Sequence, residues 1–223
     1  MAKSLKSRKQ EFVRDSIYDA AIELFDRKGF QETGVEDVAK AAGVSRRSFF
    51  RYFTTKDHLL AYSIMKYGDV LVSAVAASPA ESSALEVVHD TVLAGTQFSA
   101  AQPRTQQIMR ITSRNLSARQ ALRSRMVEVE IRLSEAFASR TRNETKDDFR
   151  PKMLAVLTLT VVDLSLFCWF KGDFEDCSSA SKFVFGQLSR VLCEPNEITG
   201  PATSQIRKSK PAVAKIRKQL AIR

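Results

Sequence analysis

Apolar side chains recur at helical spacing along most of the chain. Val13, Ile17 and Ala21 fall on one face of a helix predicted over residues 10–28, and Gly29 supplies the glycine that often follows a helix. Similar periods continue almost to the last thirty residues. The pattern therefore predicts an all-α protein with about nine helices.

Two short helices are predicted directly after the first. Gly34 takes the N-cap position of a helix over 35–42, and Gly43 ends that helix. Ser45 is placed to cap a third helix over 46–53. Small residues at the contact, a glycine in the turn and apolar inner faces are typical of a helix-turn-helix.

The rest of the chain is predicted to be helical up to about residue 193. One stretch, Met153 to Phe170, is apolar except for Asp163 near its middle and three hydroxyl residues. A central Asp disfavours a membrane span, so we predict a helix buried on nearly all sides. The predicted elements are a fourth helix capped by Thr54 or Thr55 and reaching about Ala76, then helices over 83–99, 103–115, 118–142, 149–171 and 179–193.

Composition agrees with a helical globular protein. Among 223 residues, 44% are hydrophobic, and only 8 Gly and 6 Pro are present, which is too few chain breakers for an all-β fold. The net charge is +10, and residues 201–223 hold seven basic and no acidic residues. We predict a helix-turn-helix domain over 1–56, a second helical domain over 57–195, and a basic flexible tail over 196–223.

The sequence offers little for catalysis or metal binding. Cys168, Cys177 and Cys193 include no Cys-x-x-Cys pair, and the two histidines, His58 and His89, have no nucleophile or ligand cluster beside them in sequence. We therefore expect no enzyme activity, no metal and no cofactor. The polar N-terminus lacks the apolar core of a secretory signal, so a cytoplasmic protein is expected.

One segment carries a family resemblance. GFQETGVEDVAKAAGVSRRSFFRYFTTKDHLL (29–60), preceded by AAIELFDRK, resembles the DNA-binding domain of TetR-family transcriptional regulators. The shared features are a Leu-Phe pair before a Gly-Phe, the Ala-Gly-Val-Ser turn, a third helix ending in Tyr-Phe and a Lys opening the fourth helix. Gly34 departs from the pattern, because many relatives carry a hydroxyl residue there.

The third helix carries the predicted base readers. Arg46 and Arg47 at its start can bind guanine O6 and N7, whereas Phe49 and Phe53 are expected in the core. Arg46 as a phosphate clamp remains an alternative. The resemblance implies DNA-surface roles for Arg46, Arg47, Ser48, Phe50 and Tyr52 and backbone contacts for Thr33 and Lys56, and we add Ser45 and Arg51 as phosphate contacts.

The remaining helices, over 57–195, resemble the family's effector-binding and dimerisation domain in architecture alone. The resemblance implies that the last two helices pair with their symmetry mates in a dimer, with an ordinary monomer core as the alternative. It also implies a pocket for a small-molecule effector, which we expect to be hydrophobic. His89, Gln97 and Met109 are candidates, although surface or core positions explain them better. Candidate interface residues are Leu157, Val161, Leu164, Phe167, Phe183 and Leu188.

Together these observations favour a homodimeric repressor. It would bind a pseudo-palindromic operator in double-stranded DNA and be released by an effector, with no membrane partner. A ligand-dependent activator of the same family is one alternative. A nucleic-acid-binding protein of low sequence specificity, working through its basic segments, is another.

Overall fold

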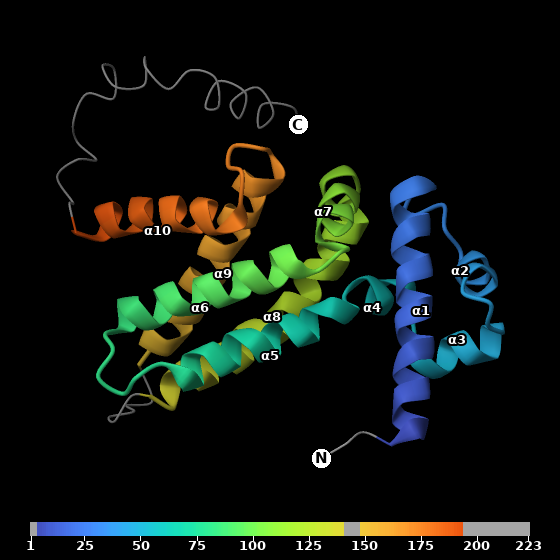
Figure 1. The fold of residues 1–223 in the computed structure, drawn as a ribbon, viewed down its shortest axis with the longest axis horizontal. Helices are drawn as coiled ribbons and strands as arrows, with labels where there is room; N and C mark the ends of the chain where they lie inside the picture. Colours follow the sequence, from blue (N-terminus) through green and yellow to red (C-terminus); the bar gives the residue numbers. More distant parts are fainter. Residues whose placement is uncertain (1–3, 141–147, 194–223) are drawn as a thin grey trace.

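The protein, described here from a computed structural model over residues 4–140 and 148–193, is all-α in these ranges (Figure 1). A small head of short helices stands beside a larger bundle, and the first helix forms the side of the head that faces the bundle. The described helices are α1 (Leu5–Arg27), α2 (Val35–Ala41), α3 (Arg46–Tyr52), α4 (Lys56–Leu60), α5 (Tyr62–Ala77), α6 (Ala84–Ala101), α7 (Thr105–Arg114), α8 (Leu116–Ala138), α9 (Arg150–Phe170) and α10 (Cys177–Cys193).

The head packs around a core of its own. Its largest fully buried side chains come from α1 to α4 and the loop after α1, and they include Phe30, Phe49 and Phe53. Ile111 of α7 and Ala118 of α8 belong to the same cluster. Because these two residues come from outside the first sixty, the head is held against α7 and α8 by apolar packing.

The bundle has a second core, built from α5, α6, α8, α9 and α10. Leu71, Val88, Leu133 and Val162 are fully or almost fully buried within it. Gly95 permits the close approach of α5 to α6, since a Cβ there would stand 2.6 Å from Leu71 Cδ2. The absence of a side chain at Gly95 therefore lets α5 and α6 pack closely against each other.

Three helix starts follow the predicted capping residues. Ser45 Oγ accepts the Ser48 N–H at 3.1 Å, and Thr55 Oγ1 accepts the His58 N–H at 3.0 Å. Gly34 is the N-cap of α2, as predicted. Each hydroxyl satisfies a backbone donor that the helix leaves free.

Two predictions of helix extent in the first eighty residues are wrong. The first helix begins at Leu5 instead of residue 10, because Ser4 caps it by accepting the Ser7 N–H. The predicted fourth helix is two helices, with a break at Ala61, so the described residues hold ten helices instead of nine. No glycine or proline marks that break; Leu59 and Leu60 are both fully buried, and their packing fixes the short α4 separately from α5.

The prediction that the apolar helix is buried on nearly all sides is also wrong within one chain. One face of α9 packs on the bundle, whereas Met153, Leu164 and Phe167 on its other face are exposed. Among the described helices, α9 alone has the length and apolar composition that a membrane span requires, a property shared by core helices of soluble proteins. Its buried face holds Thr158 and Ser165.

The predicted basic tail, 196–223, lies outside the described residues. The domain boundary at residue 56 stays a prediction, although the buried core of the head extends to Leu60.

Candidate nucleic-acid interface

The turn between α2 and α3 sets the angle of the third helix. Gly43 has φ of +65°, a conformation that side-chain-bearing residues rarely adopt, and the next residue, Val44, donates its N–H to the Ala39 carbonyl at 2.9 Å. Phe49 is fully buried and Phe53 nearly so, which anchors α3 by its inner face. The opposite face of α3 is therefore left at the surface.

That outer face carries the residues predicted to meet DNA. Arg46, Arg47 and Arg51 are exposed, and the Phe50 ring is 43% exposed. Ser48 is half-buried, and its hydroxyl lies 3.1 Å from that of Ser45. The first turn of α3 thus presents two guanidinium groups and two hydroxyls together.

Aromatic rings support the cations on this face. The Arg51 Nη2 donates to the Tyr52 hydroxyl at 3.1 Å, and the Arg51 guanidinium lies 4.9 Å from the Tyr52 ring centre. The Arg14 guanidinium of α1 lies 5.9 Å from the centre of the same Tyr52 ring. Tyr52 is half-buried, so it joins the surface of α3 to that of α1.

Two residues predicted to contact DNA make hydrogen bonds within the head. Thr33 is only 1% exposed, and its hydroxyl donates to the Gly29 carbonyl at 2.7 Å. Lys56 Nζ donates to the carbonyls of Phe30 and Gln31 at 2.8 and 3.2 Å. In this structure both side chains hold the loop after α1, and their contacts with the DNA backbone stay a prediction.

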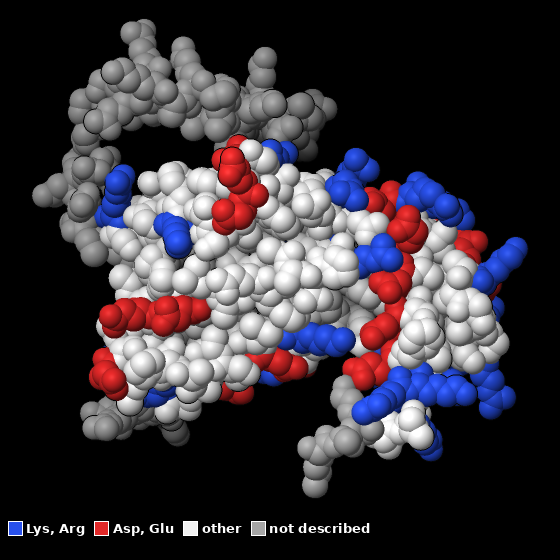
Figure 2. Space-filling model, in the orientation of Figure 1, with Lys and Arg blue, Asp and Glu red and all other residues white. Residues whose placement is uncertain are grey.

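Charge is divided along α1. Its first ten residues, Leu5–Arg14, hold four basic and one acidic residue, whereas Asp15–Arg27 hold four acidic and one basic. Figure 2 shows the consequence: acidic side chains form a band between head and bundle, and basic side chains gather at the lower end of the head. The positive end lies on the same side of the head as the start of α1.

Comparison with known proteins decides the family. The family model described as bacterial regulatory proteins, tetR family, matches residues 17–62. The transcriptional regulator TcmR of Streptomyces glaucescens is 29% identical over 164 residues, which cover 69% of this chain and 71% of TcmR. The chain belongs to the TetR family of transcriptional regulators.

Other similarities agree with this assignment. The mycofactocin biosynthesis regulator MftR of Mycobacterium tuberculosis is 51% identical over 41 residues, covering 18% of this chain and 21% of MftR. The structure of NalD from Pseudomonas aeruginosa aligns with a TM-score of 0.58 at 20% identity, over 82% of this chain and 96% of NalD. FadR from Bacillus subtilis aligns with a TM-score of 0.55 at 17% identity, over 78% and 96%. These two structures share the fold.

Ion pairs in this TetR-family protein join the head to the bundle side. Arg104, just before α7, lies 3.0 Å from a carboxylate oxygen of Asp19 and 3.0 Å from one of Glu23. Arg110 of α7 donates to both carboxylate oxygens of Asp26, at 3.3 and 2.8 Å. The three carboxylates lie on one face of α1, so Arg104 and Arg110 bind the acidic half of that helix.

The predicted effector residues do not come together. His89 of α6 is half-buried, stacks edge-on with Phe185 of α10 at 4.8 Å and contacts Asp90. Gln97 is exposed on α6, and Met109 is half-buried on α7. The groove described below is lined by none of the three, so their role stays a prediction.

The predicted dimer residues divide into two groups. Leu164, Phe167 and Phe183 are exposed, whereas Val161 is buried in the core of its own bundle. Leu157 and Leu188 are half-buried. The exposed members, with Met153 and Val156, therefore form an apolar face on α9 and α10.

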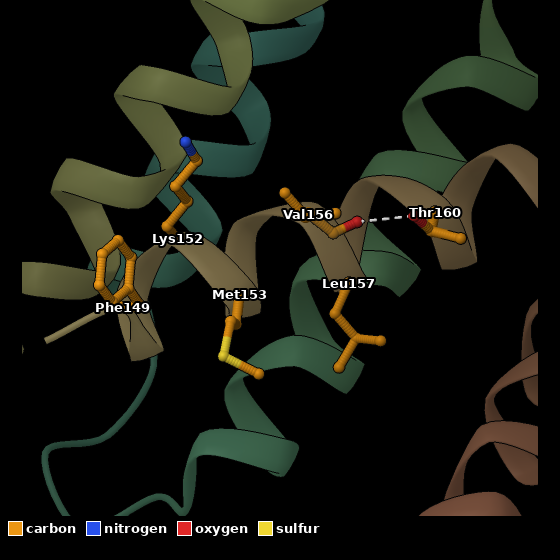
Figure 3. A pocket seen from close by; sticks show the side chains of 6 residues that line it. All are labelled: Phe149, Lys152, Met153, Val156, Leu157 and Thr160. Atoms are coloured by element: carbon orange, nitrogen blue, oxygen red, sulfur yellow. Dashed lines mark hydrogen bonds between the residues drawn. The ribbon is translucent and has the colours of Figure 1, made fainter.

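An open groove of about 420 Å³ lies along the N-terminal part of this face (Figure 3). Met153 and Leu157 point to one side of α9 and Lys152 to another, and Thr160 donates back to the Val156 carbonyl at 2.8 Å. The remaining lining residue is Phe149. Apart from the Lys152 ammonium, the groove offers few polar groups to a bound molecule.

No cluster of three or more potential metal ligands occurs in the described part of the chain. The Cys177 thiol is buried, and burial raises its pKa to about 11, so it is a weak nucleophile at neutral pH. The sequence did not reveal that Glu36 pairs with Arg46, or that Arg104 and Arg110 pair with the carboxylates of α1. Acidic residues at positions 19, 23 and 26 were the available signal for the second.

Proposed function

We propose that this regulator is a homodimeric repressor that reads a pseudo-palindromic operator and leaves it when a small apolar effector binds. The observation that carries the proposal is the division of α3 into two faces. Phe49 and Phe53 anchor one face, while Arg46, Arg47 and Phe50 stand exposed on the other. A helix presented in this way fits the major groove, where its first residues meet base edges.

The apolar face of α9 and α10 supports dimerisation. Large exposed apolar patches on soluble proteins mark interaction sites, and here Leu164, Phe167 and Phe183 are each more than 40% exposed. Gly186 lies on the exposed side of α10 with no atom near its missing Cβ, which leaves room for a partner helix to approach closely. Two-fold pairing of these helices would place one α3 on each side of the dimer.

A two-fold dimer predicts the form of the operator. Two recognition helices enter successive major grooves whose centres are about 34–36 Å apart, and the half-sites are then inverted repeats. DNA in the chromosome is the target, so we place the protein in the cytoplasm.

The effector site belongs in the bundle. Half-buried apolar residues pack against its core, and the buried hydroxyls of Thr91 and Thr158 donate to carbonyls of their own helices. These apolar residues include Ile64, Phe98, Met126 and Leu166. These surroundings favour an apolar ligand. The FadR structure of similar fold is a complex with stearoyl-CoA, which carries a long apolar chain.

Two connections would carry the effector signal to the head. The chain runs directly from α4 into α5 at Ala61, and Arg104 and Arg110 bind α1. An effector shifts the head only if it binds the DNA-competent and DNA-incompetent states with different affinities.

The proposal is tested by binding to tiled intergenic DNA from the host genome at physiological salt. Wild type should select a palindromic site, and the double variant Arg46→Ala, Arg47→Ala should lose that selectivity while keeping weak binding. Equal binding of both proteins to all sequences would contradict the proposal and favour a low-specificity nucleic-acid-binding protein.

A further inference from the structure

The two arginines that open α3 lie in different environments. Arg46 Nη1 is 2.9 Å from Glu36 Oε1, and the Arg46 guanidinium is 5.6 Å from the centre of the Phe50 ring. Arg47, by contrast, makes no hydrogen bond, ion pair or ring contact with the described residues. One guanidinium is therefore held by two neighbours, and the other is free.

We propose that Glu36 is a specificity-determining residue of the DNA-binding head. It holds Arg46 in place to read a base edge and leaves Arg47 to contact phosphate. This inference rests on the proposed sequence-specific binding and assigns different roles to two adjacent arginines, Arg46 and Arg47.

The geometry of α2 supports this role. Glu36 and Asp37 both lie in its first turn, but Asp37 is used within the head, where it accepts from Lys28 Nζ at 2.6 Å and from the Gly34 N–H at 3.0 Å. These two donors lower the pKa of the Asp37 carboxyl group. Glu36 is exposed and reaches across to α3 instead.

A guanidinium held in this way can still read a base. It carries five N–H donors, so a carboxylate at one side leaves donors for guanine N7 and O6. An exposed ion pair adds little to folding stability. Its effect is to restrict the side-chain positions of Arg46, with the Phe50 ring limiting the other side.

The charge of Glu36 also discriminates between partners. A carboxylate beside the DNA surface repels phosphates and weakens binding to every sequence. Only a site that offers Arg46 a matching base edge compensates for this repulsion, which is how a repulsive element produces specificity.

Gly34 keeps Glu36 available. A Cβ at position 34 would stand 3.6 Å from Glu36 Oε2 and 3.7 Å from Asp37 Oδ2. A hydroxyl side chain there would offer these carboxylates a competing donor. The glycine that departs from the family pattern thus removes a competitor of Arg46.

The test selects binding sites from a random pool of double-stranded DNA and compares wild type with Glu36→Gln, Glu32→Gln and Arg46→Ala. Glu32 is an exposed acidic residue of the same head and makes no described ion pair, so Glu32→Gln is a matched control for the loss of one charge. Affinity for the selected duplex and for a scrambled duplex is then measured from low to physiological salt. Circular dichroism confirms that each variant is folded.

Wild type should prefer guanine at one position of each half-site, and Arg46→Ala should lose that preference. Glu36→Gln should lower the ratio of selected to scrambled affinity by roughly 5-fold or more, since one bidentate base contact contributes about that factor or above. For Glu36→Gln, the slope of log binding constant against log salt concentration should become steeper by about 0.9, because the released Arg46 gains a phosphate contact. Glu32→Gln should change neither quantity.

The inference is overturned if Glu36→Gln keeps the wild-type ratio, if Glu32→Gln matches Glu36→Gln, or if Arg46→Ala keeps the guanine preference. If wild type selects no sequence at all, the proposed function fails instead. The two failures are therefore distinguishable.

Discussion

Adjacent residues of α3 have opposite roles. Phe49 is fully buried in the head, and Phe50, the next residue, is exposed beside Arg46. Helical geometry produces this contrast, because neighbouring positions point about 100° apart. Sequence reasoning predicted both positions, since spacing identifies the inward face and the family resemblance identifies the outward one.

This contrast yields a paired prediction. Phe49→Ala should destabilise the protein by about 3–5 kcal/mol, because it removes a buried ring and leaves a cavity. Phe50→Ala should change stability by less than about 0.5 kcal/mol, because its ring is partly exposed, and should instead weaken DNA binding. Urea denaturation and DNA titration separate the two effects. A large loss of stability in Phe50→Ala would contradict the described packing.

Other residue roles could not be predicted from the sequence. Thr33 and Lys56 match family positions, yet the fold directs the Thr33 hydroxyl to Gly29 and the Lys56 ammonium to Phe30 and Gln31. Such contacts depend on where a loop returns in space. A linear pattern does not contain that information.

Among the helices, two arginines in and just after α8 illustrate the same limit. Arg119 donates to the carbonyls of Thr112 and Ser113 at the end of α7, and Arg140 donates to the carbonyls of Val75, Ser78 and Pro79 at the end of α5. These cations satisfy carbonyls that a helix end leaves free. Periodicity predicts the helix but not which neighbouring helix its side chains cap.

The link between α7 and α1 predicts a pH dependence. Arg110 beside Asp26 lowers the pKa of that carboxyl from its ordinary value near 3.8. A lowered pKa contributes stability above the ordinary value and loses it as pH falls through the lowered one. Arg110→Met should therefore lower the free energy of unfolding by about 1 kcal/mol at pH 7, and the difference from wild type should shrink below about pH 4.

Arg125→Met is the matched control, because the Arg125 Nη1 lies 3.9 Å from Glu128 in an exposed pair within α8. It should cost little at either pH. An equal, pH-independent loss in both variants would show that the Arg110 pair does not stabilise the junction. Denaturation at pH 7 and pH 3.5 gives the comparison.

At the scale of the whole molecule, the apolar face of α9 and α10 is the largest feature that one chain leaves unexplained. The sequence showed that α9 is apolar all round, and the structure showed that its own bundle covers only one side. Burial of the other side requires a partner, which is why a single-chain pattern could not distinguish a core helix from an interface helix.

The double variant Leu164→Lys, Phe167→Lys should convert a dimer into a monomer of 25.0 kDa. Charges at the centre of an apolar interface are costly to bury, whereas the same side chains are tolerated on an exposed surface. Val127→Lys with Ile131→Lys is the control, since both residues are exposed on α8. Analytical ultracentrifugation reports the mass, and a monomeric wild type would contradict the dimer.

The paired reading of DNA by two α3 helices is the central claim, and hydroxyl-radical footprinting on the selected operator tests it most directly. We expect two protected regions related by two-fold symmetry, with centres about 34–36 Å apart along the duplex. Arg46→Ala with Arg47→Ala should remove both. A single unsymmetrical protected region, or protection that follows no sequence, would contradict the claim.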